Sequence, residues 1–198
     1  YGIASSGECL HIEKSQFKNS TQGIVAIPKV VSSANTVIVE GLGIGTSDPV
    51  TFSNCALGVY AEKCHFIDSN MKMDTMGRGI EYNALTSILP YDVYIVRNKI
   101  HSYQSAIYTN VSTSSTLHIY KNDIDYASTD STQSAITINS TGTSTVLDSN
   151  NWVKENTIQM SGLAHFGIHA TNLQNARFYC NTVHLAMPNA SCGISGGI

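Results

Sequence analysis

Two short segments near the middle of the chain decide its fold: IVRNKIHSY at residues 95–103 and IYKNDIDYA at residues 119–127. In both segments an Asn follows a basic residue, and an Ile stands two positions after the Asn. The Asn returns, again two positions before a branched apolar residue, at Asn156 and Asn181. A polar residue that recurs inside a fixed apolar pattern indicates one structural unit used several times.

The unit can be followed through most of the chain when the segments are aligned on the Asn. The aligned position holds a small or polar residue in each copy: Ser15, Cys64, Asn98, Asn122, Asn156 and Asn181. Neighbouring Asn copies lie about 24 to 34 residues apart. A second motif, a small residue followed by Ile, alternates with the first and recurs from Gly2-Ile3 to Gly193-Ile194. Each unit therefore contains an Ile-bearing strand, a second strand, a polar corner and a third strand.

Repeats of this length, with short apolar alternations and no helical period, predict a parallel β-solenoid. One coil cannot bury its inward residues alone, but the coils above and below it can, as a column of Ile and Val. Asn suits the corner because it tolerates unusual backbone angles and bonds nearby backbone groups. We expect Cys64, Asn98, Asn122, Asn156 and Asn181 to form a structural ladder, in which stacked amides hydrogen-bond one another.

The repeat resembles the right-handed parallel β-helix superfamily, to which pectate lyases and phage tailspikes belong. The resemblance covers nearly the whole chain and implies an all-β, right-handed parallel β-helix of about seven coils. The resemblance does not identify the function, because lyases, glycosidases, adhesins and tailspikes share such coils. We predict a single β-helix domain over residues 1–198. Because the repeat reaches both termini without a visible cap, we expect the chain to be an excerpt of a longer solenoid.

Composition excludes several classes of function. Charged residues make up 13% of the chain and the net charge is −3, which argues against a nucleic-acid partner. No apolar run approaches the roughly 18–20 residues that span a bilayer, so no membrane insertion is expected. The five cysteines lack metal-ligand spacing, so no metal site is predicted. The glycine cluster at 41–45 lacks the following helix of a nucleotide site, so no cofactor is predicted.

Aromatic and His side chains recur at one outward position, four residues before the corner. The column contains His11, Tyr60, Tyr94, His118, Trp152 and Arg177. Flat rings stacked at the strand spacing make platforms for sugar rings, and Tyr and Trp add a polar group. The alternative is that aromatic residues stabilise the sheet by stacking. With two outward residues of the Ile-bearing strand, the carbohydrate-binding candidates are Tyr60, Tyr94, His118, Trp152, Tyr108 and His169.

Charged side chains follow the polar corner. Asp123 and Asp125 are expected on one outward face, with Lys99 and His101 on the coil below. Two carboxylates roughly 7 Å apart suit glycoside hydrolysis, although charge pairing between coils explains them equally well. Glu81, on the outward face of the Ile-bearing strand, is the kind of base that a lyase needs. The candidate catalytic residues are Glu81, Asp123, Asp125 and His101.

Two classes of function stay open. The first is a non-catalytic, extracellular β-helix of a cell surface or virion appendage, such as a tailspike, fibre or adhesin. It would present a carbohydrate-binding face to a polysaccharide or cell-surface glycan. Uninterrupted repeats, low charge, and the missing signatures of pectate lyases and polygalacturonases favour it. The alternative is a carbohydrate-active enzyme, either a polysaccharide lyase or a glycoside hydrolase, that acts on a strand face.

The resemblance to spikes also implies a possible homotrimer, since an exposed apolar stripe suits an interface between identical chains. Val25, Ile67 and Val96 are the outward-facing apolar residues expected to contribute to it.

Overall fold

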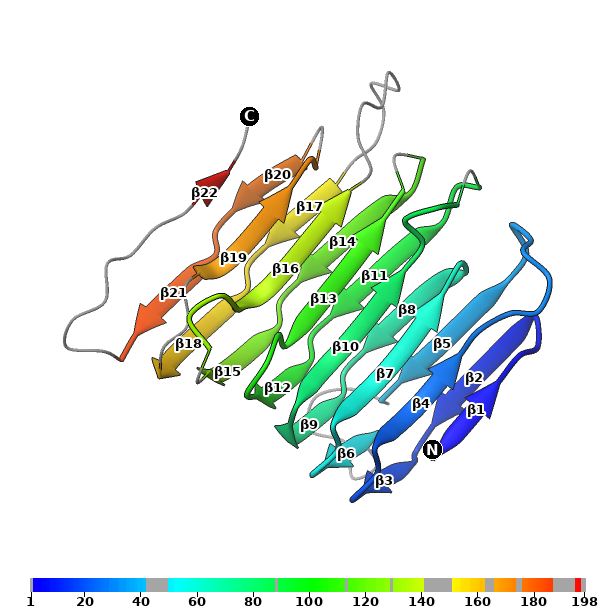
Figure 1. Cartoon of the computed structure of the whole chain (residues 1–198), viewed down its shortest axis with the longest axis horizontal. Coiled ribbons are helices and arrows are strands. Elements are labelled where there is room, and N and C mark those ends of the chain that lie inside the picture. The colour runs from blue at the N-terminus through cyan, green and yellow to red at the C-terminus, as the bar shows by residue number, and fades with distance from the viewer. Residues whose placement is uncertain are drawn as a thin grey trace.

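The computed structural model describes a chain of strands, turns and bends (Figure 1). The described residues are 2–41, 50–87, 89–112, 114–128, 130–140, 151–162, 166–173, 176–186 and 195–196. Among them there is no helix with the length and apolar composition that crossing a bilayer would require.

The strands form three parallel sheets, here named A, B and C. Sheet A contains β1 (Ile3–Ser5), β4 (Gln22–Ala26), β7 (Leu57–Glu62), β10 (Arg78–Asn83), β13 (Ile107–Val111), β16 (Ser134–Ser140), β19 (Phe166–Thr171) and β22 (Ser195–Gly196). Sheet B contains β2 (Cys9–Glu13), β5 (Thr36–Glu40), β8 (His65–Ser69), β11 (Asp92–Val96), β14 (Thr116–Tyr120), β17 (Asn151–Lys154) and β20 (Ala176–Tyr179). Sheet C contains β3 (Gln16–Lys18), β6 (Thr51–Ser53), β9 (Lys72–Met76), β12 (Lys99–Ser102), β15 (Asp123–Ser128), β18 (Thr157–Gly162) and β21 (Thr182–Leu185).

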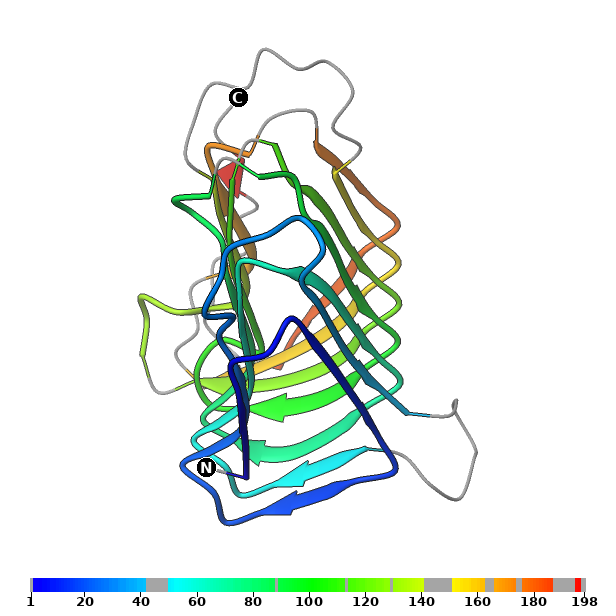
Figure 2. The same cartoon turned by 90° about the vertical axis from the view of Figure 1, so that its right-hand side faces the viewer.

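The chain visits the three sheets in turn, so each strand pairs with the strand three places along the sequence. Three consecutive strands make one coil, and the coils stack from the blue N-terminal end to the red C-terminal end (Figures 1 and 2). The predicted fold, an all-β parallel β-helix of about seven coils, is confirmed.

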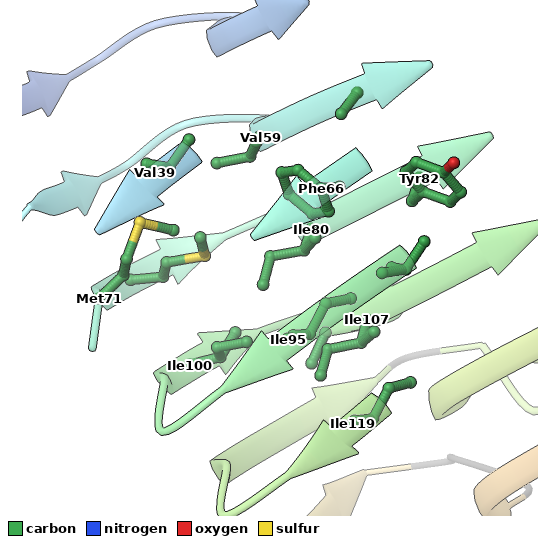
Figure 3. Packing of buried hydrophobic residues seen from close by; sticks show 14 of the residues in the cluster. Val39, Val59, Phe66, Met71, Ile80, Tyr82, Ile95, Ile100, Ile107 and Ile119 are labelled. Atoms are coloured by element: carbon green, nitrogen blue, oxygen red, sulfur yellow. The ribbon is translucent and has the colours of Figure 1, made fainter. Parts of the chain in front are cut away.

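Inward side chains form columns because equivalent residues of neighbouring coils pair in register. In sheet A the column runs through Ile24, Val59, Ile80, Ile107 and Ile136, all fully buried. Figure 3 shows how the columns of the three sheets meet inside the coil. Complete burial of such a side chain is worth about 1.5–3 kcal/mol, so each coil is stabilised mainly by its neighbours.

The corner between sheets B and C has the same backbone in the described copies. The residue before the aligned corner position adopts a left-handed conformation, with φ between 47° and 58°: Lys14, Asn70, Arg97, Lys121, Glu155 and Cys180. The expectation that the Asn itself takes the unusual backbone angle is therefore wrong. The residue before it makes the turn, and the Asn follows with its side chain pointing into the coil, where Asn98, Asn122 and Asn156 are buried.

The Asn ladder is present and extends over four coils. Asn156 Oδ1 accepts hydrogen bonds from the backbone N–H of Asn122 (3.1 Å) and from its side-chain amide (2.9 Å). Asn181 Oδ1 makes the same pair of bonds with Asn156, at 3.1 and 2.9 Å. Asn122 Oδ1 accepts the backbone N–H of Asn98 at 3.0 Å. The ladder thus satisfies backbone amides that the turn would otherwise leave unpaired inside the protein.

Cys64 lies outside this ladder, contrary to the prediction. It precedes β8, at the corner between sheets A and B. The residue stacked next to Asn98 is Met71, because Lys72 and Lys99 pair in register. The Met71 backbone N–H donates to Asn98 Oδ1 at 2.9 Å. The segment around Cys64 has a similar apolar pattern but belongs to the corner between sheets A and B. The Cys64 side chain is buried there, and this burial raises the pKa of its thiol to about 12.

Candidate functional site

The outer face of sheet B brings the predicted aromatic column together. Tyr94, His118 and Trp152 are direct neighbours in register on β11, β14 and β17. Towards the N-terminus the same column continues through Ile67, and Arg177 follows Trp152 at the other end. The rings therefore come from three successive coils, and their alignment follows from the strand register.

The three rings form a continuous row. The centroids of the Tyr94 and His118 rings are 4.6 Å apart and their planes differ by 10°. The Trp152 ring meets His118 nearly edge-on, with centroids 5.5 Å apart and planes at 81°. The first distance is close to the roughly 4.7–4.9 Å between paired strands, so the sheet itself sets the spacing of the platform.

A lysine lies beside this row, surrounded by aromatic rings. Lys154 is two residues after Trp152 on β17, and its Nζ is 4.7 Å from the Trp152 ring centroid. Tyr120 and Tyr179, at the equivalent position of the two neighbouring strands, have ring centroids 5.4 and 5.5 Å from the same Nζ. All three distances lie within the range of cation–π attraction. We call the set Tyr94, His118, Tyr120, Trp152, Lys154 and Tyr179 the aromatic face.

The charge states of this face follow from its packing. Burial lowers the pKa of His118, and the Lys154 charge acts in the same direction, while Asp92 opposes it. The imidazole is therefore neutral at neutral pH. The pKa of Lys154 is raised, mainly by its hydrogen bond with the Tyr179 hydroxyl, so this side chain stays cationic. Burial also raises the pKa of Tyr94, which keeps its hydroxyl protonated.

Tyr60 is not part of the aromatic face. It lies on β7 of sheet A, in register with Glu81 and not with Tyr94. Its hydroxyl donates to Glu62 Oε2 at 3.0 Å. Tyr60 was assigned to the wrong sheet for the same reason as Cys64. The segment YAEKCHFI spans the corner between sheets A and B, whereas the alignment is based on the corner between sheets B and C.

Three of the predicted outward residues lie on sheet A: Glu81, Tyr108 and His169. Glu81 and Tyr108 are neighbours in register, and His169 stands two coils further along the same column. Glu81 forms an ion pair with Arg78, whose guanidinium carbon lies 4.6 Å from the Tyr108 ring centroid. The base predicted for a lyase is therefore already paired with Arg78, and the same guanidinium covers the Tyr108 ring.

Sheet C holds the other catalytic candidates, away from Glu81. Asp123 pairs in register with Lys99, and Asp125 with His101, as expected from the sequence. These residues line a hollow of about 260 Å³ together with Lys72, Met73, Asp74, Ile100 and Gln159. The charges in it are largely paired: Lys99 Nζ is 3.7 Å from Asp123, and His101 Nδ1 is 3.4 Å from Asp74.

One group of side chains has the composition of a metal site, although none was predicted. His11, Glu13 and Glu40 place ligand atoms within 4.8 Å of one another on the outer face of sheet B. His11 Nε2 lies 3.1 Å from a carboxylate oxygen of each Glu. The three side chains are at least one-third exposed, and their ion pairs account for the arrangement without a metal.

Sequence reasoning missed Lys154, Tyr120 and Tyr179. They are two residues beyond the predicted column on the same strands, and side chains two apart in a strand share a face. The alternation that identified Tyr94, His118 and Trp152 therefore contained the signal for a second column beside the first.

Comparisons of the chain with protein-family models, with curated proteins and with solved structures found no match. The function is therefore inferred from the residues described above, beginning with the aromatic face on sheet B.

Proposed function

We propose that this protein is a recognition β-helix that binds polysaccharide or cell-surface glycan along the outer face of sheet B. In this proposal the stacked coils act as a rigid extracellular rod on a cell surface or virion appendage, of the tailspike, fibre or adhesin type. The same proposal places the chain in the right-handed parallel β-helix superfamily, on the strength of its repeats.

The observation that carries the proposal is the row of rings formed by Tyr94, His118 and Trp152. The C–H groups of sugar rings pack against aromatic side chains, and aromatic side chains from three successive coils offer such contacts along one glycan chain. The polar atoms needed to orient a sugar are adjacent, in the Tyr94 hydroxyl, the Lys154 ammonium and the Tyr179 hydroxyl. The rings are fixed by the sheet, so little side-chain freedom is lost on binding.

Trp152→Ala tests the proposal most directly. We expect it to weaken glycan binding by about tenfold or more, because it removes the largest ring of the row. Tyr103→Ala is the matched control, since Tyr103 is an aromatic residue outside the aromatic face and 44% exposed. Binding would be measured on glycan arrays and by calorimetry, with thermal unfolding to verify the fold. Equal binding by both variants and the unsubstituted protein would refute the proposal.

A homotrimer is part of this proposal, because identical solenoids can bury an apolar stripe against one another. Val25 and Ile67 are half-buried and available for such a contact. Val96, the third residue expected there, is 4% exposed and has almost no surface to contribute. If the trimer forms, sedimentation equilibrium would give a single mass three times that of the chain. A mass equal to that of one chain would refute the trimer.

The hollow on sheet C supports a second candidate function, glycoside hydrolysis. Asp123 and Asp125 are two positions apart on one strand, which places their carboxyl groups about 7 Å apart, within the range for an inverting pair. His101 lies beside Asp125 in register. Release of reducing ends from polysaccharides, abolished by Asp123→Asn or Asp125→Asn, would establish this activity. Binding without product would leave the aromatic face as the functional surface.

A further inference from the structure

We propose that the aromatic face selects anionic glycans, with Lys154 as the group that binds the carboxylate or sulfate of a sugar packed against the neighbouring aromatic side chains. This inference depends on the proposed function and specifies its substrate class. It comes from the position and the pairing of one cation.

Lys154 is held in place before any ligand arrives. An exposed lysine ordinarily has several rotatable bonds to order on binding, and this entropy weakens its contacts. Here the rings of Tyr120, Trp152 and Tyr179 surround the ammonium group from three successive coils, at 4.7 to 5.5 Å. The charge is therefore positioned beside the platform at little further cost.

No carboxylate of the described residues forms an ion pair with Lys154, in contrast to the lysine on the preceding coil. Lys121 Nζ lies 3.5 Å from Glu155, so Glu155, the acidic side chain whose charge acts on Lys154, already has a partner. Asp92, at the far end of the face, is bound to Thr116 Oγ1 and lies 3.4 Å from His65. The ammonium of Lys154 is thus a cation whose charge the aromatic face leaves available.

A second cation extends the same charge. Arg177 directly follows Trp152 in register on β20 and is exposed. Two cations therefore border the indole of Trp152: Lys154 on the same strand, and Arg177 on the next coil. His118, on the opposite side of Trp152, is neutral at neutral pH because burial lowers its pKa. A sugar packed against the exposed parts of His118 and Trp152 would meet uncharged side chains, with the positive charge of Lys154 and Arg177 beside it, which complements an anionic substituent.

Neutral and anionic glycans are distinguished by pairs of probes with the same backbone. Polygalacturonate, alginate and hyaluronan would each be titrated beside its carboxyl-reduced form, and a sulfated galactan beside the desulfated polymer. The protein is the full chain, and binding is measured by calorimetry at low and high salt. We expect the anionic member of at least one pair to bind about tenfold more tightly, with an advantage that shrinks as salt screens the charges.

Lys154→Gln is the critical variant, because it removes the charge and keeps most of the side-chain length. We expect it to weaken binding of the anionic probe about five- to twentyfold and binding of the neutral probe less than twofold. Lys154→Arg should retain most of the affinity. Lys18→Gln is the matched control: it removes one lysine charge from β3 of sheet C, where the side chain is exposed and away from the hollow, and should change neither affinity.

Each outcome decides a different statement. If neutral and anionic probes bind equally and Lys154→Gln changes neither, the selectivity proposed here is wrong, while a Trp152-dependent affinity would still support glycan binding. If no probe of either kind binds, both proposals are refuted. If the anionic probe binds but Lys18→Gln weakens it as much as Lys154→Gln does, the preference reflects the overall charge of the protein and the assignment to Lys154 is overturned.

Discussion

The corner between sheets B and C is built in two ways in the two halves of the solenoid. In the C-terminal half it contains the amide ladder of Asn98, Asn122, Asn156 and Asn181. In the N-terminal half the equivalent positions are Ser15, Val50 and Met71, as the pairing of the residues that follow them shows. Val50 and Met71 are buried apolar side chains. The same turn therefore accepts either a hydrogen-bonded interior or an apolar one.

What the two halves share is the left-handed residue before the corner, found at Lys14 and Asn70 as well as at Arg97 and Lys121. The turn is thus a property of the backbone, and the Asn adds hydrogen bonds to it. Where the two kinds of corner meet, beside Asn98, Asp68 points into the coil between Val39 and Ile95. It is fully buried, and neither carboxyl oxygen has a hydrogen-bond partner among the described residues.

The largest expected effect is that of breaking the ladder at Asn122. Asn122→Ala removes the acceptor for the Asn98 backbone N–H and the donor to the Ile95 carbonyl, leaving both groups buried and unpaired. We expect the free energy of unfolding to fall by about 3–5 kcal/mol, since each such group costs about 1–3 kcal/mol. Chemical denaturation measures it. Ser15→Ala, at the same corner of the first coil, should cost less than about 1 kcal/mol, and equal losses would show that the halves do not differ.

A smaller effect of opposite sign is expected at Asp68. Asp68→Val matches the apolar neighbours of its column and should raise the free energy of unfolding at pH 7 by about 1–3 kcal/mol. Burial raises the pKa of this carboxyl well above its usual range, and the nearby Asn98 amide opposes that rise only in part. Thermal and denaturant unfolding would show the gain, and a loss of stability would mean that the carboxyl has a compensating role in the interior.

The pH dependence of the free energy of unfolding tests whether the buried Asp68 carboxyl destabilises the protein when it ionises. Below the ordinary Asp pKa of 3.8 both the folded and the unfolded states hold the proton, so the site does not favour either. As the pH rises above that value the unfolded state loses the proton and the folded state keeps it, so stability falls until the raised pKa is reached. Asp68→Asn, which cannot ionise, should lack this decline. A parallel decline in both proteins would contradict the assignment.

The smallest effect concerns the turn that both halves share. A left-handed backbone is unfavourable for a residue with a Cβ atom and is natural for glycine. Lys14→Gly and Lys121→Gly should therefore each raise the free energy of unfolding by about 0.5–1 kcal/mol, less a few tenths at Lys121 for the lost ion pair with Glu155. Similar gains in both halves, measured by denaturation, would confirm that the turn is independent of the ladder; a gain in one half alone would contradict it.

The sequence allowed the fold, the inward columns and the Asn ladder to be predicted, because these depend on periodicity. An Ile or Asn that returns once per coil must stack on its equivalent, whatever the length of the loops between them. The row of Tyr94, His118 and Trp152 was found for the same reason. Prediction failed where the period was ambiguous: the segment around Cys64 fits the corner pattern by its letters, and Tyr60 was misplaced with it onto the wrong sheet.

Tertiary structure alone decided which outward side chains are available. The sequence indicated that Glu81, Asp123 and His101 face outward, but only the packing showed that each has an ion-pair partner. The packing also showed that Lys154, which the sequence did not single out, is surrounded by three rings of successive coils. The physical reason is that inward positions are fixed by one requirement, exclusion of water, which leaves a periodic trace. Outward positions depend on which charges and rings of neighbouring coils meet, and those distances exist only after the coils have stacked.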